Sequence, residues 1–344
     1  MAIELSNQTF TEQDDIVPAS GVDEIYNSGV ANTLAGNDII YGVGYFTGLA
    51  NSGSLDTGAG NDLITGIESS DNANEAAFIN SGFIDTSDGN DVLTGIGAIA
   101  ILNLNNGTIN TGNGEDSIIS KGKVSSGYFR NFRETDYPWQ FDNGNEGFIN
   151  RGGVFLGDGN DSLVVEADVP NHALLKNLNF IGTGEGNDTI TSTGVIYNEG
   201  VIETGNGDDS IIVDGGIDLD WYGNTYSIYN NGGTINMGNG NDSLIANGDF
   251  QSAYNSSGSV FLGEGEDYIK GFGSGDFYGG NGFDTLELTP GSYTVGIWGE
   301  GWDTSAIFTK GDQLMITSEF EKLKAGSTIY DFTSLTAGQI ITVA

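Results

Sequence analysis

One short pattern, Gly-x-Gly-x-Asp, recurs through most of this 344-residue chain and limits what the chain can fold into. The clearest copy is the segment 196–211, IYNEGVIETGNGDDSI, in which apolar-x-Asn-x-Gly-x-apolar precedes the Gly-x-Gly-x-Asp-x-apolar motif. Repetition of this kind is typical of a solenoid, in which every copy forms one coil. The nine copies close with Asp38, Asp62, Asp91, Asp116, Asp161, Asp188, Asp209, Asp242 and Asp267.

The residue spacing within each copy is constant, whereas the distance between successive copies varies. Successive closing aspartates are 21 to 45 residues apart, yet an Asn, or Ser256 in the last copy, lies 11 residues before each of them. We therefore expect all insertions to leave the coil on one side. We also expect the Asn column to form an internal hydrogen-bonded ladder rather than to bind metal. The column is Asn27, Asn51, Asn80, Asn105, Asn150, Asn177, Asn198 and Asn231.

Each copy also carries three apolar positions with alternating polar neighbours, which predicts three short strands per coil. Fifty-six glycines and four prolines exclude long helices. The sequence thus predicts an all-β parallel β-solenoid (a β-helix or β-roll) of about nine coils with terminal β caps. We expect an N-terminal cap over residues 1–24, the solenoid over 25–287 and a C-terminal β cap over 288–344.

Glycine occupies two fixed positions in the repeat, and we expect a different reason at each. The glycine two residues after the Asn, which Asn179 replaces once, is expected to need a positive φ. The glycine two residues before the Asp is present in all nine copies. There we expect a bound group to crowd the backbone.

The charge balance limits the partners of the chain. Its 48 acidic and 10 basic residues give a net charge of −38, which repels nucleic acids and anionic membrane surfaces. Cysteine is absent, so thiolate metal sites are excluded. The chain begins without a signal-peptide pattern and contains no apolar run of membrane-spanning length. Cations are therefore the expected partners, and neither nucleic-acid binding nor membrane insertion is expected.

The corner motif has the oxygen donors that calcium prefers. Ca²⁺ takes six to eight oxygens, more than one corner supplies, but two corners stacked about 4.8 Å apart can share an ion. We expect about eight such sites along one row. Alternatively, each Asp accepts a hydrogen bond from the main chain and binds no metal. The predicted ligands are the nine closing aspartates with Asp276 and Asp284, supported by Asn61, Asn90, Asn160, Asn187 and Asn241.

A family resemblance enters at residues 279–287. The sequence GGNGFDTLE there matches the RTX (haemolysin-type) nonapeptide G-G-x-G-x-D-x-U-x, and Asp276 and Asp284 follow Asp267 in steps of nine and eight. The resemblance is strongest over 262–287 and divergent over 25–261, where the motif occurs once per coil. It implies calcium binding and type I export from a bacterium through an uncleaved C-terminal signal. A secreted or cell-surface location without a cleaved N-terminal signal peptide follows from that resemblance.

Two insertions are rich in aromatic residues. The first, 121–145, contains four of the ten basic residues, and the second spans 214–228. Their side chains are candidates for contact with a glycan. Alternatively, the insertions fold back over the solenoid. The lone His172 is interpreted as a loop residue. The candidate glycan contacts are Tyr128, Trp139, Trp221 and Tyr222.

The leading hypothesis is a secreted calcium-binding structural or interaction protein of the bacterial cell surface or extracellular matrix, folded by calcium and able to assemble with itself. The alternative is a carbohydrate-binding protein that uses the aromatic insertions on a surface polysaccharide. A polysaccharide lyase or epimerase is less favoured, because no catalytic constellation accompanies Tyr128, Arg130, Arg133 and His172. We therefore expect no enzyme activity.

Overall fold

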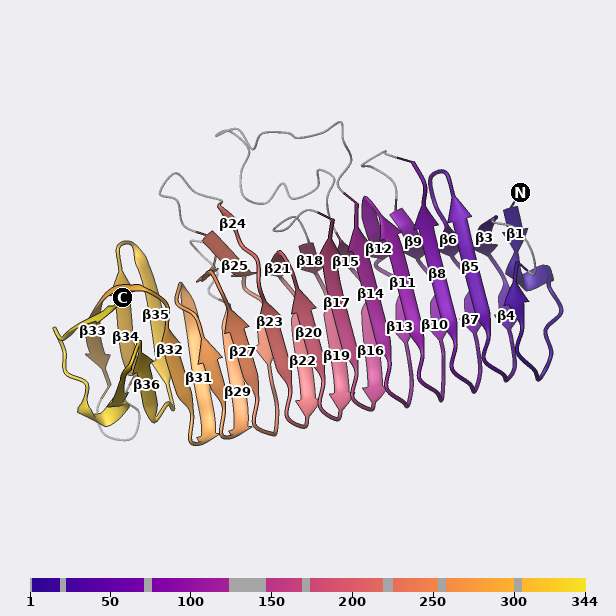
Figure 1. The fold of residues 1–344 in the computed structure, drawn as a ribbon. Coiled ribbons are helices and arrows are strands. Elements are labelled where there is room, and N and C mark those ends of the chain that lie inside the picture. Colours follow the sequence, from indigo (N-terminus) through magenta and orange to yellow (C-terminus); the bar gives the residue numbers. More distant parts are fainter. Residues whose placement is uncertain are drawn as a thin grey trace.

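The chain forms an elongated rod of stacked coils (Figure 1). The computed structural model describes residues 2–18, 23–70, 76–123, 147–168, 174–218, 225–252, 258–299 and 305–344. Three long sheets of mainly parallel strands run along the rod, and each coil contributes one strand to each sheet. The predicted parallel β-solenoid with three strands per coil is confirmed. It has roughly ten to eleven coils, more than the nine expected, because incomplete coils lie at both ends.

The first sheet has 11 strands and ends in the Asn column. Its parallel register places equivalent residues of successive coils side by side, as in Phe78 next to Ile101. The strands are β1 (Ala2–Glu4), β3 (Glu24–Asn27), β6 (Leu49–Asn51), β9 (Ala76–Asn80), β12 (Ile99–Asn103), β15 (Phe148–Asn150), β18 (Leu174–Asn177), β21 (Val195–Asn198), β25 (Thr225–Asn230), β24 (Ile217–Asp218) and β28 (Asp249–Gln251).

The second sheet has 14 strands and leads into the Gly-x-Gly-x-Asp corner. Its parallel strands are β4 (Val30–Asn32), β7 (Ser54–Asp56), β10 (Phe83–Asp85), β13 (Thr108–Asn110), β16 (Gly153–Asp158), β19 (Phe180–Glu185), β22 (Val201–Asn206), β26 (Thr234–Asn236), β29 (Ser259–Gly265), β31 (Gly275–Gly282) and β35 (Gln313–Ser318). It continues as an antiparallel C-terminal cap through β34 (Ser305–Lys310), β33 (Gly291–Trp298) and β38 (Ile340–Val343).

The third sheet has 13 strands and begins directly after the corner Asp. Its strands are β2 (Ile16–Val17), β5 (Ile39–Gly44), β8 (Leu63–Glu68), β11 (Val92–Gly97), β14 (Ser117–Gly122), β17 (Ser162–Ala167), β20 (Thr189–Ser192), β23 (Ser210–Val213), β27 (Ser243–Ala246), β30 (Tyr268–Lys270), β32 (Thr285–Leu288), β36 (Lys322–Ala325) and β37 (Thr328–Asp331). Two short 3₁₀ helices, η1 (Leu5–Asn7) and η2 (Phe332–Ser334), lie near the ends.

The inward side chains of the three sheets form one continuous core along the rod. One coil contributes Ile196, Ile202 and Ile211, all fully buried, one from each sheet. Stacked aliphatic columns therefore stabilise every coil through its two neighbours. Within the described residues, no helix is long and apolar enough to span a membrane.

The Asn column forms the expected internal ladder. The Nδ2 of each Asn donates to the Oδ1 of the Asn in the next coil at 2.8–2.9 Å. The amide serves because it is both a donor and an acceptor, so each member can use both neighbours. The members are Asn27, Asn51, Asn80, Asn103, Asn150, Asn177, Asn198 and Asn230.

The prediction was wrong for two members of the Asn column. Asn103 and Asn230 occupy the ladder in place of Asn105 and Asn231, because these two coils have longer turns after the Asn. Insertions therefore do not all leave the coil in one place. The exact 11-residue spacing in these copies arises because a second Asn stands one or two residues further on.

Both ends of the rod are closed by parts of the chain that depart from the repeat. At the N-terminus, the fully buried Leu5 follows β1 and takes the place of a ladder Asn, so the Oδ1 of Asn27 has no donor. The short strand β2 pairs with β5 and begins the 13-stranded sheet.

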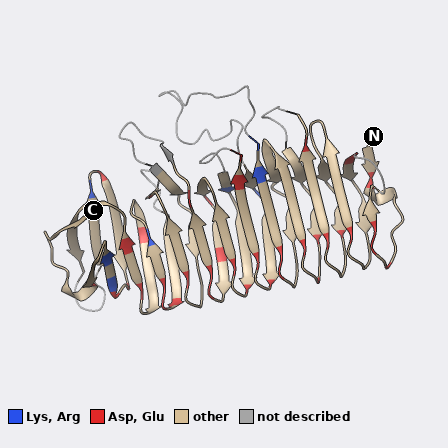
Figure 2. Ribbon diagram, viewed as in Figure 1, with Lys and Arg blue, Asp and Glu red and all other residues tan. Residues whose placement is uncertain are grey.

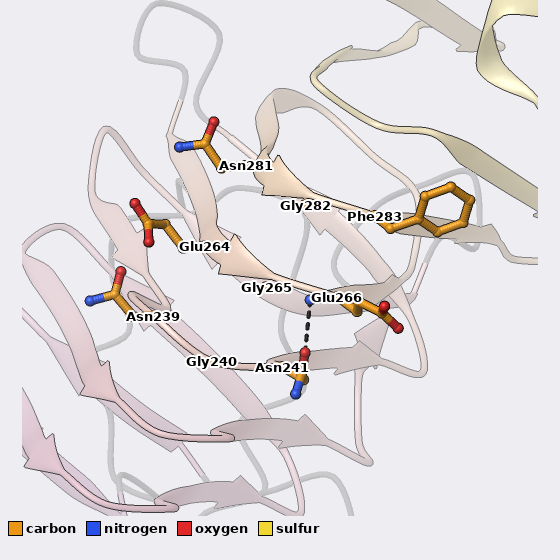
Figure 3. A pocket seen from close by; sticks show the side chains of 9 residues that line it. All are labelled: Asn239, Gly240, Asn241, Glu264, Gly265, Glu266, Asn281, Gly282 and Phe283. Carbon is orange, nitrogen blue, oxygen red and sulfur yellow. Dashed lines mark hydrogen bonds between the residues drawn. The ribbon is translucent and has the colours of Figure 1, made fainter.

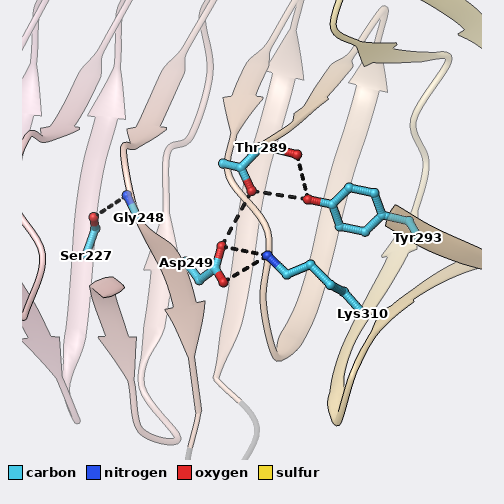
Figure 4. Close-up of polar contacts among 6 residues, drawn as sticks. All are labelled: Ser227, Gly248, Asp249, Thr289, Tyr293 and Lys310. Carbon is cyan, nitrogen blue, oxygen red and sulfur yellow. Dashed lines mark hydrogen bonds and ion pairs between the residues drawn. The ribbon is translucent and has the colours of Figure 1, made fainter. Parts of the chain in front are cut away.

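At the C-terminal end, a polar contact fastens the cap to the coils (Figure 4). Lys310 of β34 pairs with Asp249 of β28 at 3.1 Å and lies over the rings of Phe272 and Tyr293. The buried Tyr293 hydroxyl donates to the carbonyl of Thr289 at 2.6 Å. The cap is therefore held by both charge and aromatic packing.

Replacement of Asn103 by Ala removes the acceptor of Asn80 and the donor to Asn150 inside the rod. We expect a loss of about 1–3 kcal/mol in the free energy of unfolding, measured by urea denaturation. Asn105→Ala is the matched control, because Asn105 is exposed and lies two residues outside the ladder. Equal losses in the two variants would contradict the ladder.

Candidate metal-binding corners

The corner aspartates form a second, buried ladder between the 14-stranded and 13-stranded sheets. The Oδ1 of each Asp accepts the main-chain N–H of the corner Asp in the preceding coil at 2.7–3.0 Å. All side chains in the ladder are at most 2% exposed. The expected alternative role, acceptance of a main-chain hydrogen bond, is therefore confirmed for Oδ1. The ladder members are Asp38, Asp62, Asp91, Asp116, Asp161, Asp188, Asp209, Asp242, Asp267 and Asp284.

The second carboxyl oxygen, Oδ2, is different. In all ten aspartates it is buried and has no hydrogen-bond partner. Buried polar atoms are nearly always paired, and an unpaired charged oxygen is especially unfavourable. Ten such atoms in one row therefore indicate that a proton or a cation belongs beside them.

The Asp ladder ends in different groups at its two ends. At the N-terminus, the N–H of Asp15 donates to Asp38, while the carboxylate of Asp15 accepts the N–H of Thr11. At the C-terminus, the N–H of Asp284 donates to Oε2 of Glu321 at 2.7 Å. Neither Asp15 nor Glu321 belongs to a complete repeat, so spacing alone did not identify them.

The residue five positions before each Asp decides what Oδ2 faces. Gly279 shows the proximity, because a Cβ there would lie 2.8 Å from Oδ2 of Asp284. Six coils have Thr at this position, and in five of them the Thr hydroxyl donates to the carbonyl oxygen of the residue at the same position in the next coil. In three others the position is apolar and fully buried, with Leu156, Met237 and Leu262 before Asp161, Asp242 and Asp267.

Burial makes these carboxyls hard to ionise. Loss of hydration raises the pKa of Asp242 to about 8, and main-chain hydrogen bonding only partly opposes this. Burial also raises the pKa of Asp161 and Asp284 to about 7. Burial raises the pKa of Asp91 and Asp209, which follow Thr86 and Thr204, to about 6.

The remaining members shift in the same direction. Burial raises the pKa of Asp62 to about 7 and that of Asp116 to about 6, and the pKa values of Asp38, Asp188 and Asp267 are also raised by burial.

A third ladder lies on the outside of the corner. The Oδ1 of each predicted supporting Asn accepts a main-chain N–H from the following coil at 2.7–3.0 Å, the reverse direction of the Asp ladder. Figure 3 shows this arrangement for Asn241 and Glu266. The residues concerned are Asn61, Asn90, Asn160, Asn187 and Asn241.

An open pocket lies over this outer surface at the C-terminal coils. Asn239, Glu264 and Asn281 line one side and Asn241, Glu266 and Phe283 the other, with glycine backbone between them (Figure 3). The two acidic side chains are exposed, one on each side. The charge of this outer surface is therefore accessible to solvent, in contrast to the buried ladder.

The glycine expectations need correction. Gly240 has a φ of +139°, and a Cβ there would lie 1.8 Å from the carbonyl oxygen of Gly207 in the preceding coil. The crowding therefore comes from the neighbouring coil and not from a bound group. The glycine after the Asn, such as Gly53, lacks a positive φ and is needed because Gly29 O would lie 2.0 Å from its Cβ.

The remaining predicted site residues fall into two groups. Asp276 lies in β31, paired beside Ser259, and does not join the ladder, which passes directly from Asp267 to Asp284. The steps of nine and eight residues from Asp267 to Asp284 therefore make up a single coil.

The candidate glycan contacts and three further residues considered for catalysis lie outside the described residues. The glycan contacts are Tyr128, Trp139, Trp221 and Tyr222, and the other three are Arg130, Arg133 and His172.

The donors at the corner suit calcium in kind, since they are carboxylate and carbonyl oxygens. No three Asp, Glu, His or Cys side chains converge in the described part of the chain. Fewer than three such side chains could therefore contribute to an ion at the ladder. The Thr hydroxyls are additional oxygens that the sequence interpretation missed, although Thr recurs five residues before the Asp.

The sequence matches no family model and no curated protein. What is shown is a parallel β-solenoid with a stacked Asn ladder and a buried Asp ladder.

The raised pKa values predict an unusual pH dependence without metal. A carboxyl with a raised pKa binds a proton more tightly in the folded state, so its stabilisation is complete below the unfolded pKa of about 4 and is lost as pH rises through the folded value. In excess chelator, we expect the melting temperature to fall steadily from pH 5 to pH 8.5. The relevant folded pKa values are about 6 to about 8.

Asp242→Asn should reduce the fall in melting temperature between pH 5 and pH 8.5, because the amide keeps the Oδ1 acceptor and cannot ionise. Asp208→Asn is the control, since it removes one exposed charge from the adjacent residue. If both variants flattened the curve equally, general charge repulsion and not the buried ladder would be the cause.

Proposed function

We propose that this chain is a secreted or cell-surface structural protein whose coils are ordered by calcium. The observation that carries the proposal is the row of ten buried carboxyl oxygens without partners in a chain of net charge −38. Near pH 7 and above, these groups need a counter-charge to ionise inside the rod. Calcium is the cation whose donor preference matches carboxylate and carbonyl oxygens.

In this proposal the ten ladder aspartates hold one row of ions, and the outer Asn ladder keeps the corners in register. The ion supplies positive charge to Oδ2, while the chain supplies burial and alignment. The six coils with Thr before the Asp offer one more oxygen than the coils with Leu156, Met237 or Leu262. We therefore expect the Thr coils to bind calcium more tightly and some coils to stay unoccupied.

The resemblance of residues 262–287 to RTX repeats supports the same proposal and extends it to export. A chain that folds only with calcium remains unfolded where calcium is scarce and folds where it is plentiful. That property suits a protein exported before folding to a bacterial surface or matrix. The location remains a proposal based on the resemblance, and the role proposed for the rod is structural or adhesive, not catalytic.

Calcium should raise the stability of the chain at pH 8. We expect millimolar calcium to raise the melting temperature and the β-sheet signal in far-UV circular dichroism relative to excess chelator. Magnesium at the same concentration is the ionic-strength control, because it demands a smaller octahedral shell. Identical melting curves in calcium, magnesium and chelator would contradict the proposal.

The number of bound ions tests which aspartates are responsible. Asp62→Asn should remove about one ion from the stoichiometry measured by calorimetric titration, because it removes one buried carboxylate. Asp56→Asn in the same coil is the control, since Asp56 lies on the outer side of β7 and binds Asn32. An unchanged stoichiometry in Asp62→Asn would exclude the ladder as the binding site.

A further inference from the structure

The outer side of the 14-stranded sheet carries aromatic side chains in two pairs. Phe155 of β16 and Phe180 of β19 have ring centroids 5.2 Å apart, with planes tilted by 33°. Phe261 of β29 and Tyr278 of β31 have ring centroids 4.7 Å apart, with planes inclined by 8°. Phe155 is 42% exposed and Phe261 is 38% exposed, and the other two rings are half-buried. Clustered rings at the surface of a highly charged protein, unlike scattered single ones, indicate a binding surface.

Two glycines make room for the first pair. A Cβ at Gly153 would lie 2.7 Å from Cε2 of Phe155, and a Cβ at Gly182 would lie 2.7 Å from Cε1 of Phe180. The two rings therefore fold down over these glycines instead of standing away from the sheet. Neither glycine has a positive φ, so the backbone conformation does not require them. What they provide is space for the rings.

The second pair leaves part of its ring faces open. Carbon atoms of stacked rings are in contact at about 3.5 Å. A centroid distance of 4.7 Å between nearly parallel planes therefore means that the rings of Phe261 and Tyr278 are offset from each other. Because offset rings cover each other only in part, a flat apolar ligand can contact the uncovered part of each face.

Polar side chains lie between the two aromatic pairs. Parallel pairing places Gly182, Glu203, Asn236, Phe261 and Tyr278 side by side in successive coils. Within the described residues, the side chains of Glu203 and Asn236 have no hydrogen-bond or ion-pair partner. We call the two aromatic pairs together with Glu203 and Asn236 the aromatic strip. It crosses six strands, from β16 to β31, which at a spacing of about 4.8 Å gives a length of about 24 Å.

Charge limits what the aromatic strip can bind. Figure 2 shows the acidic residues concentrated along the corner edge of the rod, into which this sheet leads. A polyanion, including a second copy of this chain with its net charge of −38, is therefore repelled. Glu203 is the single charged side chain among the six of the strip. Apolar contact and hydrogen bonding, rather than charge, therefore govern what the strip recognises.

We propose that the aromatic strip binds one chain of an uncharged, β-1,4-linked polysaccharide that lies along the rod. The ring faces pack against the apolar C–H faces of the sugars, while Glu203 and Asn236 form hydrogen bonds with sugar hydroxyls. An extended chain of this linkage repeats its sugar rings at nearly the strand spacing, so each coil meets one sugar. The site uses neither the calcium proposed at the corners nor the aromatic insertions.

Isothermal titration calorimetry of the folded chain with cellohexaose and with chitohexaose tests this site. We expect at least one of the two to bind. That hexaose should bind at least tenfold more tightly than its triose, because only the hexaose reaches both aromatic pairs. Sodium polygalacturonate, an acidic chain, should not bind. Failure of both hexaoses to bind would overturn the proposal, and so would equal affinity for hexaose and triose.

Substitutions locate the binding on the strip. Phe155→Ala and Tyr278→Ala should each weaken hexaose binding about tenfold, with little change in melting temperature, because each removes one surface ring. Phe83→Ala is the matched control, since Phe83 is 40% exposed on the same side of the sheet but lies between Ser54 and Thr108. Binding that survives both strip substitutions, or that all three substitutions weaken equally, would overturn the proposal.

Discussion

The structure depends on the close stacking of equivalent backbone corners. Adjacent coils approach at the spacing of a β-sheet, about 4.8 Å, so a residue at a corner meets its own counterpart on both sides. Asn tolerates this arrangement because its amide both donates and accepts, so each amide between the two ends of the ladder bonds to both of its neighbours. A carboxylate only accepts, so each corner Asp uses Oδ1 for a main-chain N–H and leaves Oδ2 without a partner.

This difference between amide and carboxylate connects the fold to its proposed chemistry. The repeat that positions the coils also places ten acids in a low-dielectric row, where a proton or a calcium ion must offset the charge. In the proposed function, protons and calcium compete for one set of oxygens, so pH and calcium would act on folding through the same equilibrium.

The internal pattern of the repeat predicted the three-sheet solenoid and nine ladder aspartates, and the nonapeptide match supplied the tenth, Asp284, because a parallel stack repeats its constraints in every coil. Spacing failed where local turns vary. Asn105 and Asn231 matched by count, but longer turns place Asn103 and Asn230 in the ladder. Asp276 matched the steps of nine and eight residues, but it lies in β31 beside Ser259 of β29 and outside the ladder. The cause of the corner glycines was also hidden, since the crowding carbonyl belongs to the preceding coil and appears only once the coils are stacked.

The central claim is that the buried carboxyls are neutralised by protons or by cations. Carbon-13 NMR of the aspartate carboxyls in the folded chain tests it directly by a pH titration in chelator and in calcium. We expect a set of ladder signals to titrate well above the exposed aspartates in chelator, and calcium to shift that set to lower pH. Titration of all aspartates together near pH 4, with no effect of calcium, would contradict the account.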